Sequence, residues 1–202
     1  MQTTAISLSH HVAQILQDYL AAYPSETYGL RELADQLSVE PQDVFLRCNM
    51  RGHITSSALV IDQARSKMLM INHPLHDRWL HPGGHVESDC NSLWDAASEE
   101  VTQETGLEVM APLSHFSRRG IPLDIDTHQI IANPKRGEVA HLHHDFMFIA
   151  VSQFDFEPNP QAGDAVKEAK WMPLSALLEL PGDRMKRLAT KVSGVLAHTR
   201  NH

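Results

Sequence analysis

Hydrophobic residues recur at helical spacing near the start of the chain. Residues 8–22 carry an apolar stripe that ends before Pro24, which predicts an amphipathic helix. A second helical segment is expected to begin at Ser25, and a third short one spans residues 41–48. The stripe of the first segment consists of Leu8, Val12, Ile15, Leu16, Tyr19 and Leu20, and that of the second of Leu30, Leu33, Ala34 and Leu37.

From residue 54 the pattern changes to apolar runs that are typical of β-strands. These runs are separated by turn-rich stretches, which predicts hairpins. A helix is expected from 95 to 105, and two more near the end, from 173 or 174 to 180 and from 183 to 198. The expected strands cover 54–62 and 67–72 around the turn 63–66, 78–87, one or two within 108–119, 121–132 and 139–152 around the turn 133–137, and 168–174.

These patterns predict an α/β protein in two parts, with an N-terminal helical extension over residues 1–49 and an α/β domain over residues 50–202. The segment LRELADQLSVEPQDVF also resembles a helix–turn–helix, the DNA-reading alternative. Its acidic residues disfavour phosphate contacts, since these need basic side chains. We therefore expect the extension to pack on the domain or on a second subunit, which makes a homodimer a further prediction.

The charge and cysteine content narrow the choice of partners. The formal net charge of −8 argues against a nucleic acid as the main partner, because no basic stripe offsets it. Substrate phosphates would then require a metal ion or local cations such as Arg78, Arg118 and Arg119. The sequence has no long apolar run and no signal-peptide pattern, and its two cysteines, Cys48 and Cys90, form no disulfide framework, so we expect a cytoplasmic protein without a membrane span.

The chemistry is concentrated in residues 82–107, PGGHVESDCNSLWDAASEEVTQETGL. On the expected helix, Glu100, Gln103 and Glu104 lie at i, i+3 and i+4 and share one face. Oxygen ligands at this spacing suit Mg²⁺ or Mn²⁺, which also bind substrate phosphates. The plainer interpretation is a solvated acidic face. The Gly83-Gly84 turn and the Thr105-Gly106 helix end favour the metal site.

This stretch resembles the signature box of the Nudix hydrolases, and the flanking segments 52–58, 78–87 and 168–174 are similar to strands of that superfamily. The resemblance covers about residues 50–182. It implies a Nudix-type α/β/α sandwich with a mixed β-sheet. Gly84, Glu100, Val101, Glu104, Gly106 and Leu107 match the box.

The sequence departs from the box at functional positions. Cys90 stands where a glutamate is expected, although the neighbouring Asp89 could substitute, and Glu99 stands at the arginine position after a spacer one residue longer than usual. Gln103 replaces an acidic residue and offers a carbonyl oxygen without charge. The expected consequence is weaker metal binding or fewer bound ions.

A second group of candidate residues lies on the predicted hairpin. Because side chains alternate along a strand, HLHHDFMFIAV puts His141, His143 and Asp145 on one face, and PLDIDTHQI does the same for Asp124, Asp126 and His128. Such a surface could bind Zn²⁺, Mn²⁺ or Fe²⁺, or supply acid and base groups. The alternative is a polar strand face in water or histidines bonded to aspartates. His53, His73, His76 and His81 are expected to cap or solvate loops.

The hypothesis that follows is a Mg²⁺- or Mn²⁺-dependent hydrolase that cleaves a pyrophosphate bond in a nucleoside diphosphate linked to another group. The first alternative is a nucleotide-binding regulatory protein with an inactive box; the second moves the chemistry to the histidine and aspartate hairpin with a different metal. The metal ligands and catalytic groups are expected to be Glu100, Gln103 and Glu104, with the Gly83 carbonyl. The substrate-binding candidates are Gly84, His85, Glu87, His128, His141, His143 and Asp145, with Asp126 and Glu138 as further polar groups and Asp145 or Glu138 as an extra carboxylate.

Overall fold

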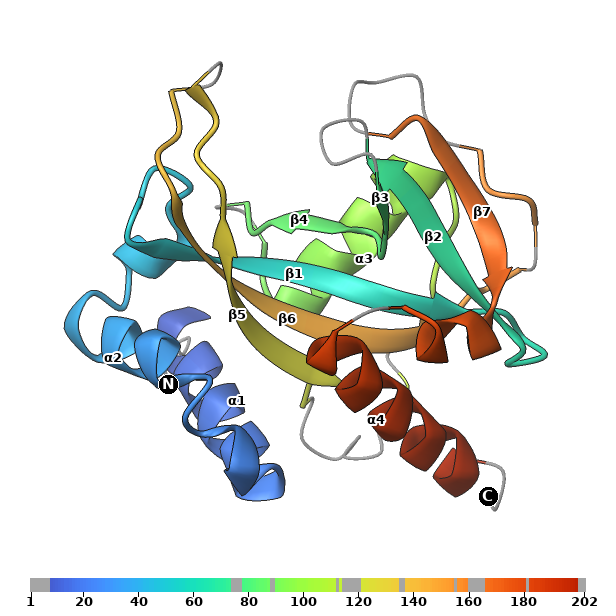
Figure 1. The fold of residues 1–202 in the computed structure, drawn as a ribbon, viewed down its shortest axis with the longest axis horizontal. Helices are drawn as coiled ribbons and strands as arrows, with labels where there is room; N and C mark the ends of the chain where they lie inside the picture. Colours follow the sequence, from blue (N-terminus) through green and yellow to red (C-terminus); the bar gives the residue numbers. More distant parts are fainter. Residues whose placement is uncertain are drawn as a thin grey trace, which may run out of the picture.

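A computed structural model describes residues 8–73, 78–87, 90–111, 113, 121–134, 137–154, 156–159, 166–180 and 182–199. Its centre is β1 (Gly52–Ile61), which is buried over its whole length and pairs in parallel with β6 (His141–Val151). The remaining strand pairs are antiparallel, so the sheet is mixed, as the resemblance implied. Figure 1 shows these two strands crossing the middle of the molecule.

The seven-stranded sheet has the order β3-β2-β1-β6-β5, with β4 beside β1 and β7 beside β2. Both predicted hairpins are confirmed, because β1 pairs with β2 and β5 pairs with β6. In the described part of 108–119, an isolated bridge from Val109 to Ser152 takes the place of the expected strand. The other strands are β2 (Lys67–His73), β3 (Arg78–Leu80), β4 (Gly83–His85), β5 (Asp124–Ile130) and β7 (Glu168–Pro173).

Helices cover both faces of the sheet. Because side chains alternate along each strand, the two faces contribute to two different hydrophobic cores. Ile54, Ala58 and Val60 of β1 share one hydrophobic core with α1 (Leu8–Ala22), α2 (Arg31–Val39) and α3 (Leu93–Thr105). The opposite face of β1 packs on α4 (Asp183–Thr199) and the short 3₁₀ helix η4 (Leu174–Leu178). The α/β/α layering and the N-terminal helix α1 confirm the expected fold class (Figure 1).

The N-terminal helices differ in detail from the sequence expectation. The first helix is confirmed, but Pro24 starts a 3₁₀ turn, η1 (Pro24–Glu26), and α2 begins only at Arg31. The third predicted helix is a single 3₁₀ turn, η2 (Asp43–Phe45). The apolar stripe of α1 is buried in the same core as the sheet. The boundary at residue 50 and the homodimer stay predictions.

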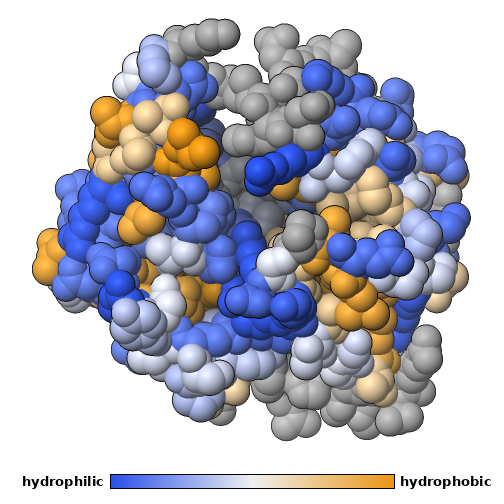
Figure 2. All heavy atoms as spheres, viewed as in Figure 1, coloured by the Kyte–Doolittle hydropathy of each residue, from blue (hydrophilic) through white to orange (hydrophobic). Residues whose placement is uncertain are grey.

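Hydrophilic residues cover most of the molecular face seen in Figure 2, and hydrophobic residues form smaller patches on it. Among the described residues, we find no helix with the length and apolarity that a bilayer span requires.

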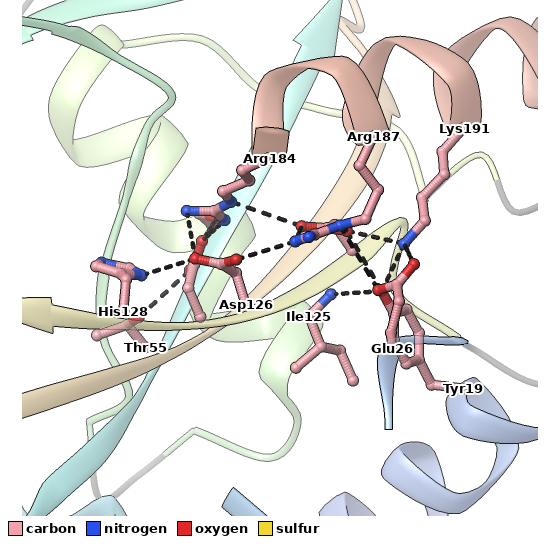
Figure 3. Close-up of polar contacts among 12 residues, drawn as sticks. Tyr19, Glu26, Thr55, Ile125, Asp126, His128, Arg184, Arg187 and Lys191 are labelled. Atoms are coloured by element: carbon pink, nitrogen blue, oxygen red, sulfur yellow. Dashed lines mark hydrogen bonds and ion pairs between the residues drawn. The ribbon is translucent and has the colours of Figure 1, made fainter. Parts of the chain in front are cut away.

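A buried ionic network holds α4 and the N-terminal segment on the sheet (Figure 3). Arg187 donates to both carboxylate oxygens of Asp124, at 2.8 and 2.9 Å, and Lys191 donates to the same carboxylate at 2.8 Å. The Tyr19 hydroxyl of α1 accepts hydrogen bonds from Lys191 and from the Ile125 backbone amide, and it donates to Glu26. The fully buried Asp124 is thereby the point at which α1, β5 and α4 meet.

A second junction joins α2 to the sheet through a buried amide. The Gln36 side chain donates to the Gly52 carbonyl at 2.6 Å, and its carbonyl oxygen lies 3.0 Å from Nε2 of His144. The other ring nitrogen of His144 lies 2.9 Å from the Thr127 hydroxyl. Burial lowers the pKa of His144 to about 4, so the ring is neutral at pH 7 with its proton shared toward Gln36.

We expect Asp124→Asn to lower the free energy of unfolding by about 3 kcal/mol, because it leaves the Arg187 and Lys191 cations without their shared buried carboxylate. Urea denaturation would measure this change. The matched control is Asp183→Asn, which removes an exposed carboxylate paired with Lys186 and should leave stability unchanged. A loss below about 1 kcal/mol for Asp124→Asn would contradict the role assigned to the network.

Stability should also fall as the pH drops from about 6.5 towards 4, because His144 takes up a proton more readily in the unfolded chain than in the fold. At pH 5 this histidine alone should cost about 2 kcal/mol relative to pH 8. Denaturation curves at pH 8, 6 and 5 would check the slope. His144→Gln, which does not titrate, should show a shallower pH dependence, and an unchanged slope would argue against this origin.

Candidate active site

The helix α3 is defined by signals at both of its ends. The Ser92 side chain accepts a hydrogen bond from the Asp95 amide at 3.1 Å and caps the N-terminus, so the helix begins at Leu93, two residues before the expected start. Gly106 closes the helix in the left-handed conformation, with φ of 70°, as its position predicted. The buried Leu93, Ala97 and Val101 fix the orientation of the opposite, acidic face.

Gly83 and Gly84, which the sequence placed in a turn, instead form strand β4 with His85, and they allow the backbone to approach this acidic face. A Cβ atom at Gly84 would lie 2.2 Å from a carboxylate oxygen of Glu100, and a Cβ at Gly83 would lie 2.4 Å from the Ser57 side chain. The Gly83 amide donates to Glu104 at 3.0 Å. The Pro82-Gly83-Gly84 sequence therefore brings β4 directly onto the carboxylates of α3.

Glu104 is buried and Glu100 is half-buried, and their carboxylates form a pair on the acidic face of α3. Burial, followed by the charges of Glu87 and Glu99, raises the pKa of Glu100 to about 7. Burial and the Glu100 charge raise the pKa of Glu104 to about 8, against the opposing effect of the Gly83 amide. Within the described residues, neither carboxylate forms an ion pair with a lysine or arginine.

Glu100 borders a pocket of about 260 Å³. Gln103 faces it from the exposed side of α3, where its amide donates to Glu99 at 3.1 Å. Cys90 also lies at the pocket, whereas Asp89 falls outside the described residues. The residues that line the pocket are His85, Glu87, Cys90, Ala96, Glu99, Glu100 and Gln103.

The donor set of this pocket suits a hard divalent ion. Its acidic groups offer oxygen atoms, and the half-buried Glu100 of the lining lies next to the buried Glu104, where a cation would offset their mutual repulsion. The Gln103 carbonyl could join them after rotation away from Glu99. Of the three cations suggested by the sequence, Arg78 is exposed on β3, and Arg118 and Arg119 lie outside the described residues.

The predicted hairpin surface is present, and the structure gives the register of its two strands, β5 and β6. His128 lies opposite His143, and Asp126 lies opposite Asp145. The parallel pairing of β1 with β6 adds His53 beside His143. Five histidines from four strands thus gather on one face of the sheet: His53, His85, His128, His141 and His143.

The aspartates of this surface are held by arginines of α4. Arg184 donates to Asp145 at 2.6 Å, and Thr55 and Ser57 donate to the same carboxylate. Arg187 donates to Asp126 at 2.9 Å, and His128 shares the same carboxylate. Burial opposes the ionised form of Asp126, but the hydrogen bond with His128, the charge of Arg184 and the hydrogen bond from Arg187 lower its pKa.

Glu138, the other extra carboxylate expected, is paired with Arg47 at 3.2 Å. Both candidates for the extra carboxylate, Asp145 and Glu138, are therefore engaged by arginines.

The sequence expectation for His53 was wrong, because His53 lies buried within β1 with 1% of its surface exposed. The missed signal is the period of two in HITSSALVI, where the polar residues 53, 55 and 57 share one face of the strand. His81 lies between β3 and β4, as a loop residue should, and burial of its ring lowers its pKa to about 4. The side chains of His73 and His76 lie outside the part of the chain that the structure describes.

Comparison with known proteins gives three kinds of result. The NUDIX domain profile matches residues 51–191. A protein of Lactococcus lactis subsp. cremoris (strain MG1363) named "Probable DHNTP pyrophosphohydrolase" is 32% identical over 97 residues, 48% of this chain. The chain spans about half of that relative's length (52%).

Solved structures with similar folds include a NUDIX hydrolase of Clostridium perfringens, with a TM-score of 0.48 and 21% identity over 73% of this chain and 97% of the other. An Ap4A hydrolase of C. elegans has a TM-score of 0.49 and 19% identity, covering 72% and 98% of the two chains. The profile match covers more than half of the chain and contains both the acidic helix and the glycine turn. The chain therefore belongs to the Nudix superfamily.

Proposed function

We propose that this protein is a Mg²⁺- or Mn²⁺-dependent hydrolase that cleaves a pyrophosphate bond in a nucleoside diphosphate linked to another group. The observation that carries the proposal is the pair Glu100 and Glu104, two largely buried carboxylates with raised pKa values and no cationic partner among the described residues. A buried pair of like charges is costly, and a divalent ion would offset that cost. Membership of the superfamily supports the same chemistry.

The roles of the residues follow from their positions. Glu104 and Glu100 would hold the ion, assisted by the Gln103 carbonyl and the Gly83 carbonyl. The bound ion would supply charge neutralisation on the bridging oxygen and acidify a water molecule. Glu104 also fixes the glycine turn through the Gly83 amide.

The neighbouring polar groups would bind and orient the substrate. His85 lines the pocket, and its ring would contact a phosphate oxygen there. The exposed Glu87 carboxylate at the same pocket is our candidate to accept a proton from the attacking water. Gly84 leaves room beside Glu100, and the surface with His128, His141, His143 and Asp145 adjoins the pocket through His85.

A nucleotide-binding protein with weak or no turnover is the second candidate. The observation that favours it is the state of the altered box positions: Gln103 is bonded to Glu99, and the thiol Cys90 occupies the pocket where a carboxylate is expected. Gln103 and Cys90 each remove a negative charge that a metal ion would use, and Glu99 adds a negative charge away from the ion.

The deciding experiment measures phosphate and nucleotide release from a panel of nucleoside diphosphate derivatives, with Mg²⁺ or Mn²⁺. The panel should include ADP-ribose, diadenosine tetraphosphate and dihydroneopterin triphosphate, the last because of the named relative. Metal-dependent turnover that disappears in Glu100→Gln/Glu104→Gln would support the hydrolase. Binding without turnover on every compound would favour the second candidate.

Glu104→Gln should reduce turnover by on the order of 100-fold, because one charged oxygen ligand is lost. The amide carbonyl can still accept from Gly83 and the repulsion with Glu100 disappears, so the melting temperature without metal should not decrease. Steady-state kinetics and thermal melts with and without Mn²⁺ would test both statements. Glu108→Gln, at an exposed glutamate just beyond α3, is the matched control.

The double variant Glu99→Arg/Gln103→Glu should tighten Mn²⁺ binding and raise turnover by about tenfold. It restores the charges of the family box and removes the repulsion that a new carboxylate at 103 would meet from Glu99. Gln103→Glu alone should gain less, for that reason. Isothermal titration and kinetics would give both quantities; no gain in either variant would show that position 103 does not face the metal.

A further inference from the structure

We propose that His53, His141 and His143 form a second metal site, one that takes a borderline divalent ion such as Zn²⁺ and is separate from the acidic pocket. The candidate ligand atoms of these three residues lie within 4.8 Å of one another. They come from two neighbouring strands, since His53 is the parallel partner of His143 and His141 lies two residues earlier on β6. The sequence expectation combined the histidines and the aspartates of the hairpin, whereas this set replaces the aspartates with His53 of β1.

One pair of ring nitrogens has the spacing of tetrahedral coordination, and the third ligand atom lies within 4.8 Å of both. A Zn–N bond of about 2.0–2.1 Å places two nitrogen ligands about 3.3 Å apart. Nε2 of His141 lies 3.3 Å from Nε2 of His143, and Nε2 of His53 lies 3.1 Å from Nε2 of His85. Bringing the three ligand atoms to ideal separations requires at most about 1.5 Å of side-chain movement.

The tautomers of two rings are fixed in the form that ligates a metal. Nδ1 of His53 faces the Asn49 carbonyl at 3.2 Å, and Nδ1 of His141 faces the Val139 carbonyl at 2.7 Å. A carbonyl only accepts, so Nδ1 carries the proton in each neutral ring and Nε2 keeps its lone pair. Backbone carbonyls play this orienting role behind metal-bound histidines.

Burial and charge also favour an ion at this place. His53 and His141 are 1% and 6% exposed, so their lone pairs face the cluster rather than water. The aspartates that could compete for the imidazoles are occupied by Arg184 and Arg187. Simple N–H···N hydrogen bonds would satisfy the histidine rings in pairs, but they would not require three rings to converge on one point.

The identity of the donors separates the two sites. Neutral imidazoles suit Zn²⁺ and related ions, whereas Mg²⁺ prefers oxygen. His85 touches His53 on one side and lines the acidic pocket on the other, so it marks the border between them and is available as a fourth ligand. Three protein ligands with a further open position resemble a catalytic rather than a closed structural zinc site.

The test is titration of the full chain, freed of metal by a chelator, with Zn²⁺ and with Co²⁺ in the presence of millimolar Mg²⁺. We expect one equivalent of Zn²⁺ to bind, and Co²⁺ to give the visible spectrum of tetrahedral nitrogen coordination. His141→Gln and His143→Gln should each weaken binding at least about tenfold. His128→Gln, a histidine of the same hairpin outside the three-nitrogen set, should bind as the wild type does.

Glu100→Gln/Glu104→Gln should retain Zn²⁺ binding, which separates this site from the proposed hydrolase centre. Loss of Zn²⁺ binding in that variant, an octahedral Co²⁺ spectrum, or unchanged affinity in both His141→Gln and His143→Gln would overturn the proposal. Circular dichroism would check the folding of each variant. If the buried His141→Gln does not fold, the more exposed His143→Gln and the Co²⁺ spectrum of the wild type decide.

Discussion

The parallel pairing of β1 with β6 is the constraint on which the rest of the structure depends. Its register runs without interruption from Gly52 opposite Leu142 to Ile61 opposite Val151. Because β1 also pairs with the glycine strand β4 and β6 with β5, this one ladder connects the acidic helix to the histidine hairpin. A shift of one residue would turn every side chain of β1 to the opposite face and exchange His53 for Ile54.

Along one face of this ladder the side chains change from apolar to ionic to imidazole. Met147, Ile149 and Val151 of β6 pack in the core with α4, and Asp145 meets Arg184 at the start of that helix. His143 and His141 lie beyond the helix, where no arginine of α4 is bonded to them in the described residues. The position at which α4 begins therefore separates a structural ion network from a set of histidines.

The two faces of the sheet also separate the carboxylates from the histidines. Glu100 and Glu104 lie with α3 on one side, and the histidines lie on the other, with β4 between them. Alternation within β4 explains the division, because Gly84 meets Glu100 while His85 meets His53. Carboxylates and imidazoles are thus kept apart, and His85 is the histidine of this group that borders the same pocket as Glu100.

The sequence by itself determined the elements with strong local signals. The cap at Gly106, the two hairpins and the helix 8–22 follow from local chemistry, and so does the spacing of Glu100 and Glu104 on one helix face. Beyond the two hairpins, the tertiary structure alone decided which strands are neighbours, and it put Gly83 and Gly84, expected in a turn, into strand β4. The roles of Arg184 and Arg187 were invisible in the sequence, since they meet Asp145 and Asp124 across 39 and 63 positions. That of His53 depends on the register of the parallel ladder, which local patterns do not fix.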